Sequence, residues 1–131
     1  MTPIILGERP SKGGPYRTIE PSSTTRQLDR LRPGWELEFK TMNVWPYAWC
    51  DEERVDVDAL DAPIIVALGS NVLAELGLFT GRWLEWQTRG DSYVLRMPHP
   101  SGVNRWYNDA TNCRRASNAL KVAVKLSCAA A

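Results

Sequence analysis

The sequence predicts an α/β protein, a three-layer α/β/α sandwich built around a short, mainly parallel central sheet. Two continuous apolar runs, at residues 3–6 and 63–68, each end at a glycine, which is typical of parallel strands that are buried on both faces. From about residue 104 to residue 129, apolar side chains recur at spacings of three and four, as on one face of a helix. Strand, helix, strand, strand and helix in this order indicate helices packed on a sheet.

Length and composition indicate a single domain over residues 1–131. Hydrophobic residues make up 44% of the chain and charged residues 24%, which is ordinary for a globular protein with a real core. The three cysteines, Cys50, Cys113 and Cys128, are far apart and form no CxxC pair, which argues against a zinc site and a disulfide framework. No leader or membrane-spanning apolar run is present, so we expect a cytoplasmic, monomeric protein with no membrane partner.

The net charge of +1 hides an uneven distribution along the chain. Residues 1–34 carry six basic and three acidic side chains, and residues 102–131 carry five basic and one acidic. Residues 51–61 carry six acids and one base. A basic face on a nearly neutral protein is compatible with a nucleic-acid partner but is weak evidence for one.

The first half of the chain reads as strand, loop, helix and strand. A strand near residues 3–7 runs into a loop that is rich in glycine, proline and charge. Several N-cap residues at 21–25 and a stop at Pro33-Gly34 bound a short helix. Alternating apolar and charged residues favour a strand within residues 37–44, and we expect it near residues 38–44.

The second half begins with an acidic loop that contains a short helix at residues 56–61. A buried strand at residues 63–68 follows, and a helix over residues 70–76 ends at Gly77. Strands at residues 84–88 and 92–97 are joined by a tight turn at Arg89-Gly90-Asp91. One long helix from about Asn104 to Ala129 completes the chain.

The loop before that helix holds His99, the only histidine of the protein, between Pro98 and Pro100. Proline fixes φ and removes a backbone donor, so a Pro-His-Pro run is stiff and can aim one imidazole. The alternative is a histidine that caps a turn, with prolines that only end a strand. Ser101 and Gly102 follow as a small donor and a residue that allows close approach.

Four segments, in their order and spacing, resemble motifs of the uracil-DNA glycosylase superfamily. They are Ile-Leu-Gly-Glu-Arg-Pro at residues 5–10, Gly-Pro-Tyr at 14–16, Thr-Met-Asn-Val at 41–44 and His-Pro-Ser-Gly at 99–102. The apolar run up to Gly69 also resembles the family's central strand. The chain departs from the family at Ser11, where a glycine is usual, and it has three cysteines where iron–sulfur members need four.

The resemblance implies a uracil-DNA glycosylase-like fold and a DNA glycosylase that hydrolyses the N-glycosidic bond of uracil or a related modified pyrimidine in DNA. It implies base flipping, with DNA as partner and without a metal, iron–sulfur cluster or redox cofactor. His99 would stabilise the leaving base and Glu8 would orient a water toward the sugar. Asn43 would read the base edge and Tyr16 would stack on the base.

The same resemblance implies DNA contacts by residues next to these motifs. Ser11 and Ser101 are small donors suited to phosphates, and Val103 is placed to wedge into the gap left by a flipped base. Arg105 would contact the DNA backbone, and Gly102 and Asn104 lie in the same stretch. Because they follow different strands, we expect the side chains of His99, Asn43 and Glu8 to converge at the carboxyl edge of the sheet.

Two other functions remain open on this sequence. One is a catalytically inactive module of the same fold that binds DNA or unusual bases, which the Ser11 departure supports. The other is a hydrolase or transferase that acts on free nucleosides or nucleotides. Each site residue also has a structural reading: Glu8 as a solvated loop acid, Tyr16 as loop packing, Asn43 as a turn cap and Val103 as core.

Overall fold

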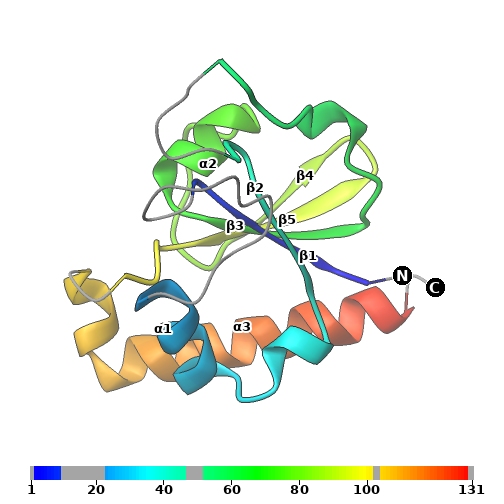
Figure 1. Ribbon diagram of the computed structural model, residues 1–131. Helices are drawn as coiled ribbons and strands as arrows, with labels where there is room; N and C mark the ends of the chain where they lie inside the picture. Colours follow the sequence, from blue (N-terminus) through cyan, green and yellow to red (C-terminus); the bar gives the residue numbers. More distant parts are fainter. Residues whose placement is uncertain (1, 10–22, 47–51, 102–103, 130–131) are drawn as a thin grey trace.

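The middle layer of the protein is a five-stranded sheet in the order β2-β1-β3-β5-β4 (Figure 1). The computed structural model describes residues 2–9, 23–46, 52–101 and 104–129. The strands are β1 Ile4–Gly7, β2 Lys40–Asn43, β3 Ile64–Leu68, β4 Trp86–Arg89 and β5 Ser92–Met97. All neighbours pair in parallel except β4 and β5, which form an antiparallel hairpin.

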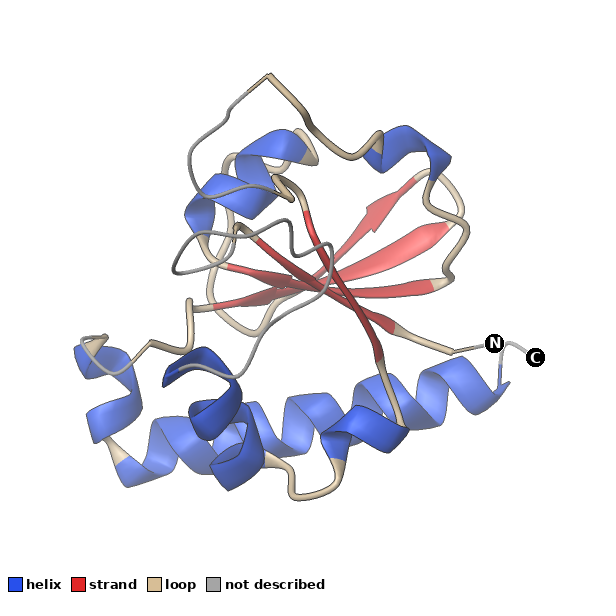
Figure 2. Cartoon of the chain, in the orientation of Figure 1, coloured by secondary structure: helices blue, strands red, loops and turns tan. Residues whose placement is uncertain are grey.

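Helices cover both faces of this sheet, so the chain forms three layers (Figure 2). Helix α1 (Ser23–Leu31) and helix α3 (Ala110–Ala129) lie on one face. Helix α2 (Ser70–Glu75) and the 3-10 helix η2 (Val57–Ala59) lie on the other. Two further 3-10 helices are η1 (Trp35–Leu37) and η3 (Arg105–Asn108). In the described part of the chain, no helix combines the length and hydrophobicity that crossing a bilayer requires.

The two faces of the sheet bury separate hydrophobic cores. Ile5 packs in the core beneath α1 and α3, whereas its neighbours Ile4 and Leu6 pack in the core beneath α2. Successive strand residues point to opposite faces, so a strand covered on both sides must be apolar throughout. This explains the continuous apolar runs of β1 and β3, and confirms the predicted α/β architecture with a mainly parallel sheet.

Parallel pairing brings the carboxyl ends of four strands to one edge of the sheet. Gly7 at the end of β1 lies opposite Asn43 at the end of β2. Leu68 at the end of β3 lies opposite Met97 at the end of β5. The loops that leave these strands therefore start side by side, which is the arrangement in which open α/β sheets bind ligands.

The prediction of one helix from about residue 104 is wrong at its start, because two capping side chains divide the segment. Asn104 Oδ1 accepts a hydrogen bond from the backbone N of Trp106 at 3.1 Å and begins η3. Asp109 Oδ1 accepts from Thr111 N at 2.7 Å and Asn112 N at 3.2 Å and begins α3. A short polar side chain that bonds to the backbone ahead of it starts a new helix instead of continuing an old one.

The remaining predicted elements are present, with shifted ends. The hairpin has a two-residue turn, since Arg89 pairs with Ser92, and Gly90 supplies the positive φ of 58° that such turns need. The strand expected at residues 84–88 is displaced to Trp86–Arg89, and Leu84 instead has a φ of 67°, outside strand geometry. The short helix expected within 56–61 is the 3-10 helix η2.

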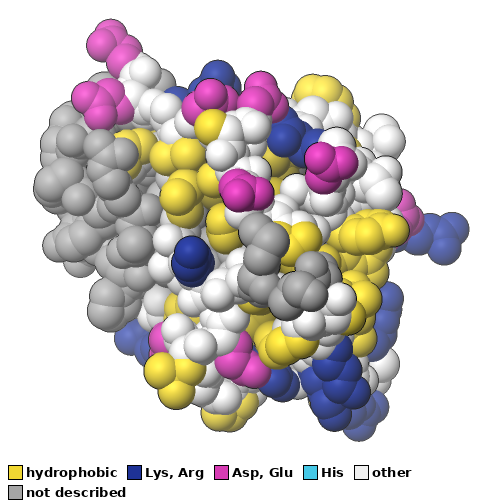
Figure 3. All heavy atoms as spheres, turned by 90° about the vertical axis from the view of Figure 1, so that its right-hand side faces the viewer, with side chains coloured by type: hydrophobic (Ala, Val, Ile, Leu, Met, Phe, Trp, Pro, Cys, Tyr) yellow, Lys and Arg dark blue, Asp and Glu magenta, His cyan; other side chains and the backbone are white. Residues whose placement is uncertain are grey.

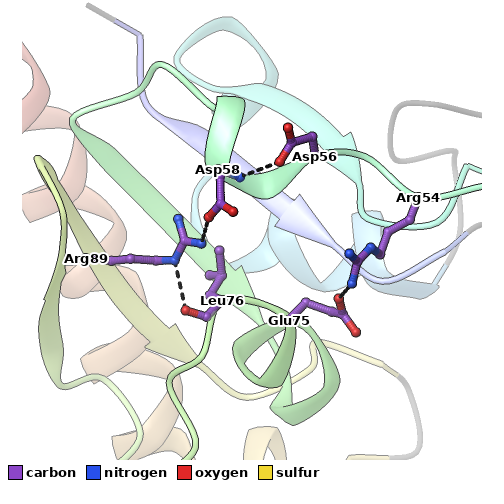
Figure 4. A network of polar contacts seen from close by, with 6 residues as sticks. All are labelled: Arg54, Asp56, Asp58, Glu75, Leu76 and Arg89. Carbon is purple, nitrogen blue, oxygen red and sulfur yellow. Dashed lines mark hydrogen bonds and ion pairs between the residues drawn. The ribbon is translucent and has the colours of Figure 1, made fainter.

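Two arginines hold the acidic segment against α2 and β4 (Figure 4). Arg54 forms an ion pair with Glu75 of α2. Arg89 of β4 forms an ion pair with Asp58, and its Nε donates to the backbone oxygen of Leu76 at 2.8 Å. Asp58 thus holds η2 to β4, and the Arg54–Glu75 pair holds the start of the acidic segment to α2.

Candidate functional site

The carboxyl edge of the sheet carries three of the predicted site residues. Glu8 follows β1 directly, Asn43 is the last residue of β2, and His99 comes two residues after β5. Backbone pairing between the segments of β1 and β2 continues beyond the strands, because Val44 N donates to Gly7 O and Trp45 N donates to Glu8 O, both at 2.9 Å. The backbone that carries Glu8 is thereby fixed to the neighbouring strand.

Glu8 and His99 line one pocket of about 260 Å³ at this edge. Its lining residues are Glu8, Leu68, Gly69, Ser70, Asn71 and His99. They come from the ends of β1, β3 and β5 and from the first turn of α2. The fold thus places a carboxylate and an imidazole, far apart in the sequence, against the same small volume.

The carboxylate of Glu8 has a fixed neighbour in the pocket wall. Asn71 of α2 donates a hydrogen bond from Nδ2 to Glu8 Oε1. An amide that holds one carboxylate oxygen limits the rotation of the whole group, so the second oxygen also has a defined direction. Sequence reasoning missed Asn71. Its position two residues after Gly69, where a buried strand turns into a helix, was the available signal.

His99 is half-buried, and its environment favours the neutral imidazole. Burial lowers the pKa of His99 from its ordinary value near 6.5, and the negative charge of Glu8 opposes this shift without cancelling it. At neutral pH the ring therefore carries one N–H donor and one bare nitrogen acceptor. A neutral ring can still donate a hydrogen bond to a negative charge that develops in the pocket.

Gly69 allows the close packing of His99 against the start of α2. Its φ is +94°, and a Cβ built at this position would lie 3.2 Å from the Cβ of His99. Such backbone geometry is almost confined to glycine, and the contact distance leaves little room for a side chain. Glycine is thus needed at position 69 for two reasons: the backbone has a positive φ, and His99 packs against it.

Asn43 lies at the same edge but is enclosed. Its residue is only 3% exposed, and its side chain is not in the lining of the pocket as the described residues form it. The structure therefore brings Glu8 and His99 together and leaves Asn43 buried beside them, on the far side of β1 from β3.

The remaining predicted residues have different positions. Ser101 is partly exposed and Arg105 is exposed at the start of η3. The side chain of Asn104 is used within the chain, since Nδ2 donates to His99 O at 2.8 Å while Oδ1 caps η3. Tyr16, Ser11, Gly102 and Val103 lie outside the described residues.

The arrangement of Glu8 and His99 is suited to acid–base and electrostatic chemistry. A carboxylate can orient a water and accept its proton, and a nearby imidazole N–H can stabilise an anion. Within residues 2–9, 23–46, 52–101 and 104–129, no three histidine, cysteine or acidic side chains are grouped so that they could hold a metal ion.

Comparison with known proteins adds no family to this picture. No protein-family model matches the chain, and a comparison with curated proteins found no match.

Proposed function

We propose that the protein is a DNA glycosylase of the uracil-DNA glycosylase type, which hydrolyses the bond between deoxyribose and uracil or a related modified pyrimidine. The observation that carries this proposal is the shared pocket of Glu8 and His99 at the carboxyl edge of the sheet. Both residues lie in segments that resemble motifs of that superfamily. The α/β architecture with a mainly parallel sheet supports the same assignment at the level of fold.

The proposed reaction uses the two groups on opposite ends of the breaking bond. As the N-glycosidic bond breaks, its electron pair leaves with the base and the sugar becomes positive at C1′. His99 donates its N–H toward the base oxygen where negative charge develops, which is worth about 3–4 kcal/mol for one preorganised donor. Glu8, held by Asn71, orients the water that attacks C1′ and accepts its proton. The base leaves as an anion and is protonated by solvent, Glu8 returns its proton to solvent, and the other product is an abasic sugar.

The pocket has room for a single base, because its volume is about 260 Å³. A base in a duplex can reach such a pocket only by rotation out of the stack, so the proposed reaction includes base flipping.

The test is an activity panel on labelled oligonucleotides that contain uracil, hydroxymethyluracil or a mismatch, treated with alkali after incubation. We expect strand breaks on at least one of them. His99→Ala should lower turnover by about two to three powers of ten while DNA binding changes little, because its bond strengthens only in the transition state. Asp61→Asn, at an exposed acid away from the pocket, is the control and should keep full turnover.

Other outcomes would point to the rival functions. DNA affinity without strand breaks on any oligonucleotide would indicate a binding module that lacks catalysis. Release of bases from free nucleosides, with no strand breaks and no salt-dependent DNA affinity, would indicate a nucleoside hydrolase. Equal losses in binding and rate for His99→Ala would make His99 a residue that positions the DNA.

A further inference from the structure

Three successive backbone carbonyls around His99 are each held by a donor from elsewhere in the chain. Met97 O accepts from Gly69 N at 2.8 Å. Pro98 O accepts from the hydroxyl of Tyr107 at 2.5 Å. His99 O accepts from Ser101 N at 2.9 Å and from Asn104 Nδ2 at 2.8 Å.

The prolines explain why the loop is held through its carbonyls. Pro98 and Pro100 have no N–H, so two of three successive residues cannot donate to the rest of the protein. A loop with so few N–H groups depends largely on donors that reach its oxygens. Two of those donors are side chains: Tyr107 lies in η3, and Asn104 caps the start of η3.

Among the described residues, the Tyr107 hydroxyl forms one hydrogen bond, the one to Pro98 O. The residue is 8% exposed and its ring already packs in the core beneath α1 and α3. Phenylalanine would fill the same space, whereas a buried hydroxyl is costly unless it finds a partner. Burial raises the pKa of Tyr107 far above its ordinary value, so the hydroxyl keeps its proton and remains a donor.

We propose that Tyr107 and Asn104 are positioning residues, which set the place of the His99 imidazole by holding the carbonyls of Pro98 and His99. We call these two side chains, with the two carbonyls that they hold, the clamp. Its role in catalysis rests on the proposed function, but its hydrogen bonds do not.

The single histidine makes the clamp directly observable. The imidazole C–H signals in a proton NMR titration can come from one residue only, and they report its pKa without any substrate. Among the described residues, the charged group that acts on the His99 pKa is Glu8 after β1, and Ser70 and Asn71 of α2, which line the same pocket, are neutral. None of these is altered in the variants below, so a shift reports the position and hydration of the ring.

Two variants each remove one clamp donor. Tyr107→Phe deletes only the hydroxyl. Asn104→Ser deletes the donor to His99 O but keeps an oxygen that can cap η3. We expect each to admit water to the loop and to raise the His99 pKa toward its ordinary value by about half a unit, a shift that part of one hydrogen bond can supply. Tyr93→Phe, at a half-exposed tyrosine on β5, is the matched control and should leave the titration unchanged.

Activity gives the second measurement. If the wild type excises a base, Tyr107→Phe should lower kcat by about tenfold or more with little change in KM, because a displaced catalytic group loses rate and not substrate affinity. If the variants shift the His99 pKa but the wild type has no glycosylase activity, the clamp is supported and the proposed function is overturned. If the wild type is active but the variants leave the His99 pKa unchanged, the proposed function is supported and the clamp is overturned.

The clamp is overturned if the folded variants titrate like the wild type. Circular dichroism establishes that each variant is folded before its titration is compared. Should Tyr107→Phe fail to fold, Asn104→Ser decides alone, since its side chain is only partly buried.

Discussion

Burial of the His99 ring makes the stability of the fold depend on pH. The pKa of His99 is lowered in the folded state, so between that pKa and about 6.5 the unfolded chain binds more protons than the folded protein. Stability is therefore constant at higher pH, falls as the pH drops through about 6.5, and levels off below the folded pKa.

Denaturant unfolding at pH 7.5 and pH 5.5 measures this loss. His99→Asn removes the titrating group, so its stability should change less than that of the wild type between the two conditions. The two proteins should not differ in pH dependence above pH 7.5. If the variant loses as much stability as the wild type on acidification, burial of His99 is not the cause.

Asn43 tests the choice of base under the proposed function. An amide offers one acceptor and two donors, which suits the imide edge of uracil. Asn43→Asp removes the donors, so uracil excision should weaken while excision of cytosine rises relative to it. Competition between uracil- and cytosine-containing oligonucleotides measures the ratio. Because Asn43 is 3% exposed, an unchanged uracil rate and ratio would assign it to the packing of β2 instead.

At the scale of single residues, sequence reasoning selected the groups with distinctive chemistry. Glu8 and His99 were identified from their motifs, and they do share a pocket. Asn71 and Tyr107 were missed because each acts through a contact with a remote partner, and in the case of Tyr107 that partner is a backbone oxygen. A backbone carbonyl leaves no mark in the sequence, so such contacts become visible only in three dimensions.

The junction between β3 and α2 is the element on which the site depends most. Gly69→Ala should destabilise the fold by about 2–4 kcal/mol, since alanine is strained at a φ of +94° and its Cβ would press on His99 at 3.2 Å. Gly77→Ala is the matched control. Its φ is +77°, but nothing lies within 4 Å of the added Cβ, so we expect a loss of about 1 kcal/mol.

Thermal and denaturant unfolding of the two variants provide the comparison. The difference between them reports two effects at Gly69 together: the contact with His99, and a backbone at φ 94° and ψ 168° that almost only glycine adopts. Gly69→Ala should also shift the His99 imidazole signals, whereas Gly77→Ala should not. Equal losses of stability and an unshifted histidine would mean that the loop moves aside at no cost.

Elements with a regular pattern were predictable, and the breaks between them were less so. The runs of β1 and β3 are apolar at every position because both faces of each strand are covered. The division of the last segment into η3 and α3 was missed, because the apolar spacing continues across Asp109. The capping capacity of Asn104 and Asp109 was in the sequence, but periodicity outweighed it.

Across the whole molecule, charge is divided between the two helical layers. Helix α3 has no acidic residue, and Arg114, Lys121 and Lys125 are exposed along it. Figure 3 views the molecule from the right-hand side of Figure 1 and shows Lys and Arg side chains near the lower edge, at the height of α3. The acidic segment packs on the opposite layer around η2 (Figure 4). This layer therefore attracts a phosphate backbone more strongly than the η2 layer does, and the C-terminal half of α3 runs back beside the start of β1, away from the edge that holds the pocket (Figure 1).

The proposed function predicts a salt-dependent DNA affinity that depends on this layer. Neutralising Arg114, Lys121 and Lys125 together with glutamine should reduce the slope of log affinity against log salt by up to about 2–3, since each phosphate contact contributes about 0.9. Fluorescence anisotropy over a salt series measures the slope. Arg54→Gln with Arg82→Gln, two exposed bases outside α3, should leave it unchanged. An unchanged slope in the triple variant would exclude α3 from the DNA interface.

The position of α3 also determines when the protein can become fully folded during synthesis. Every strand of the sheet precedes Ala110 in the chain, but the core on the α1 side is completed by Ala116, Leu120 and Ala123 of α3. A ribosome-bound chain that has emerged only as far as η3 therefore leaves part of this apolar sheet face exposed to solvent and to chaperones. Helix α3, which is made after all five strands, is the element that closes this core.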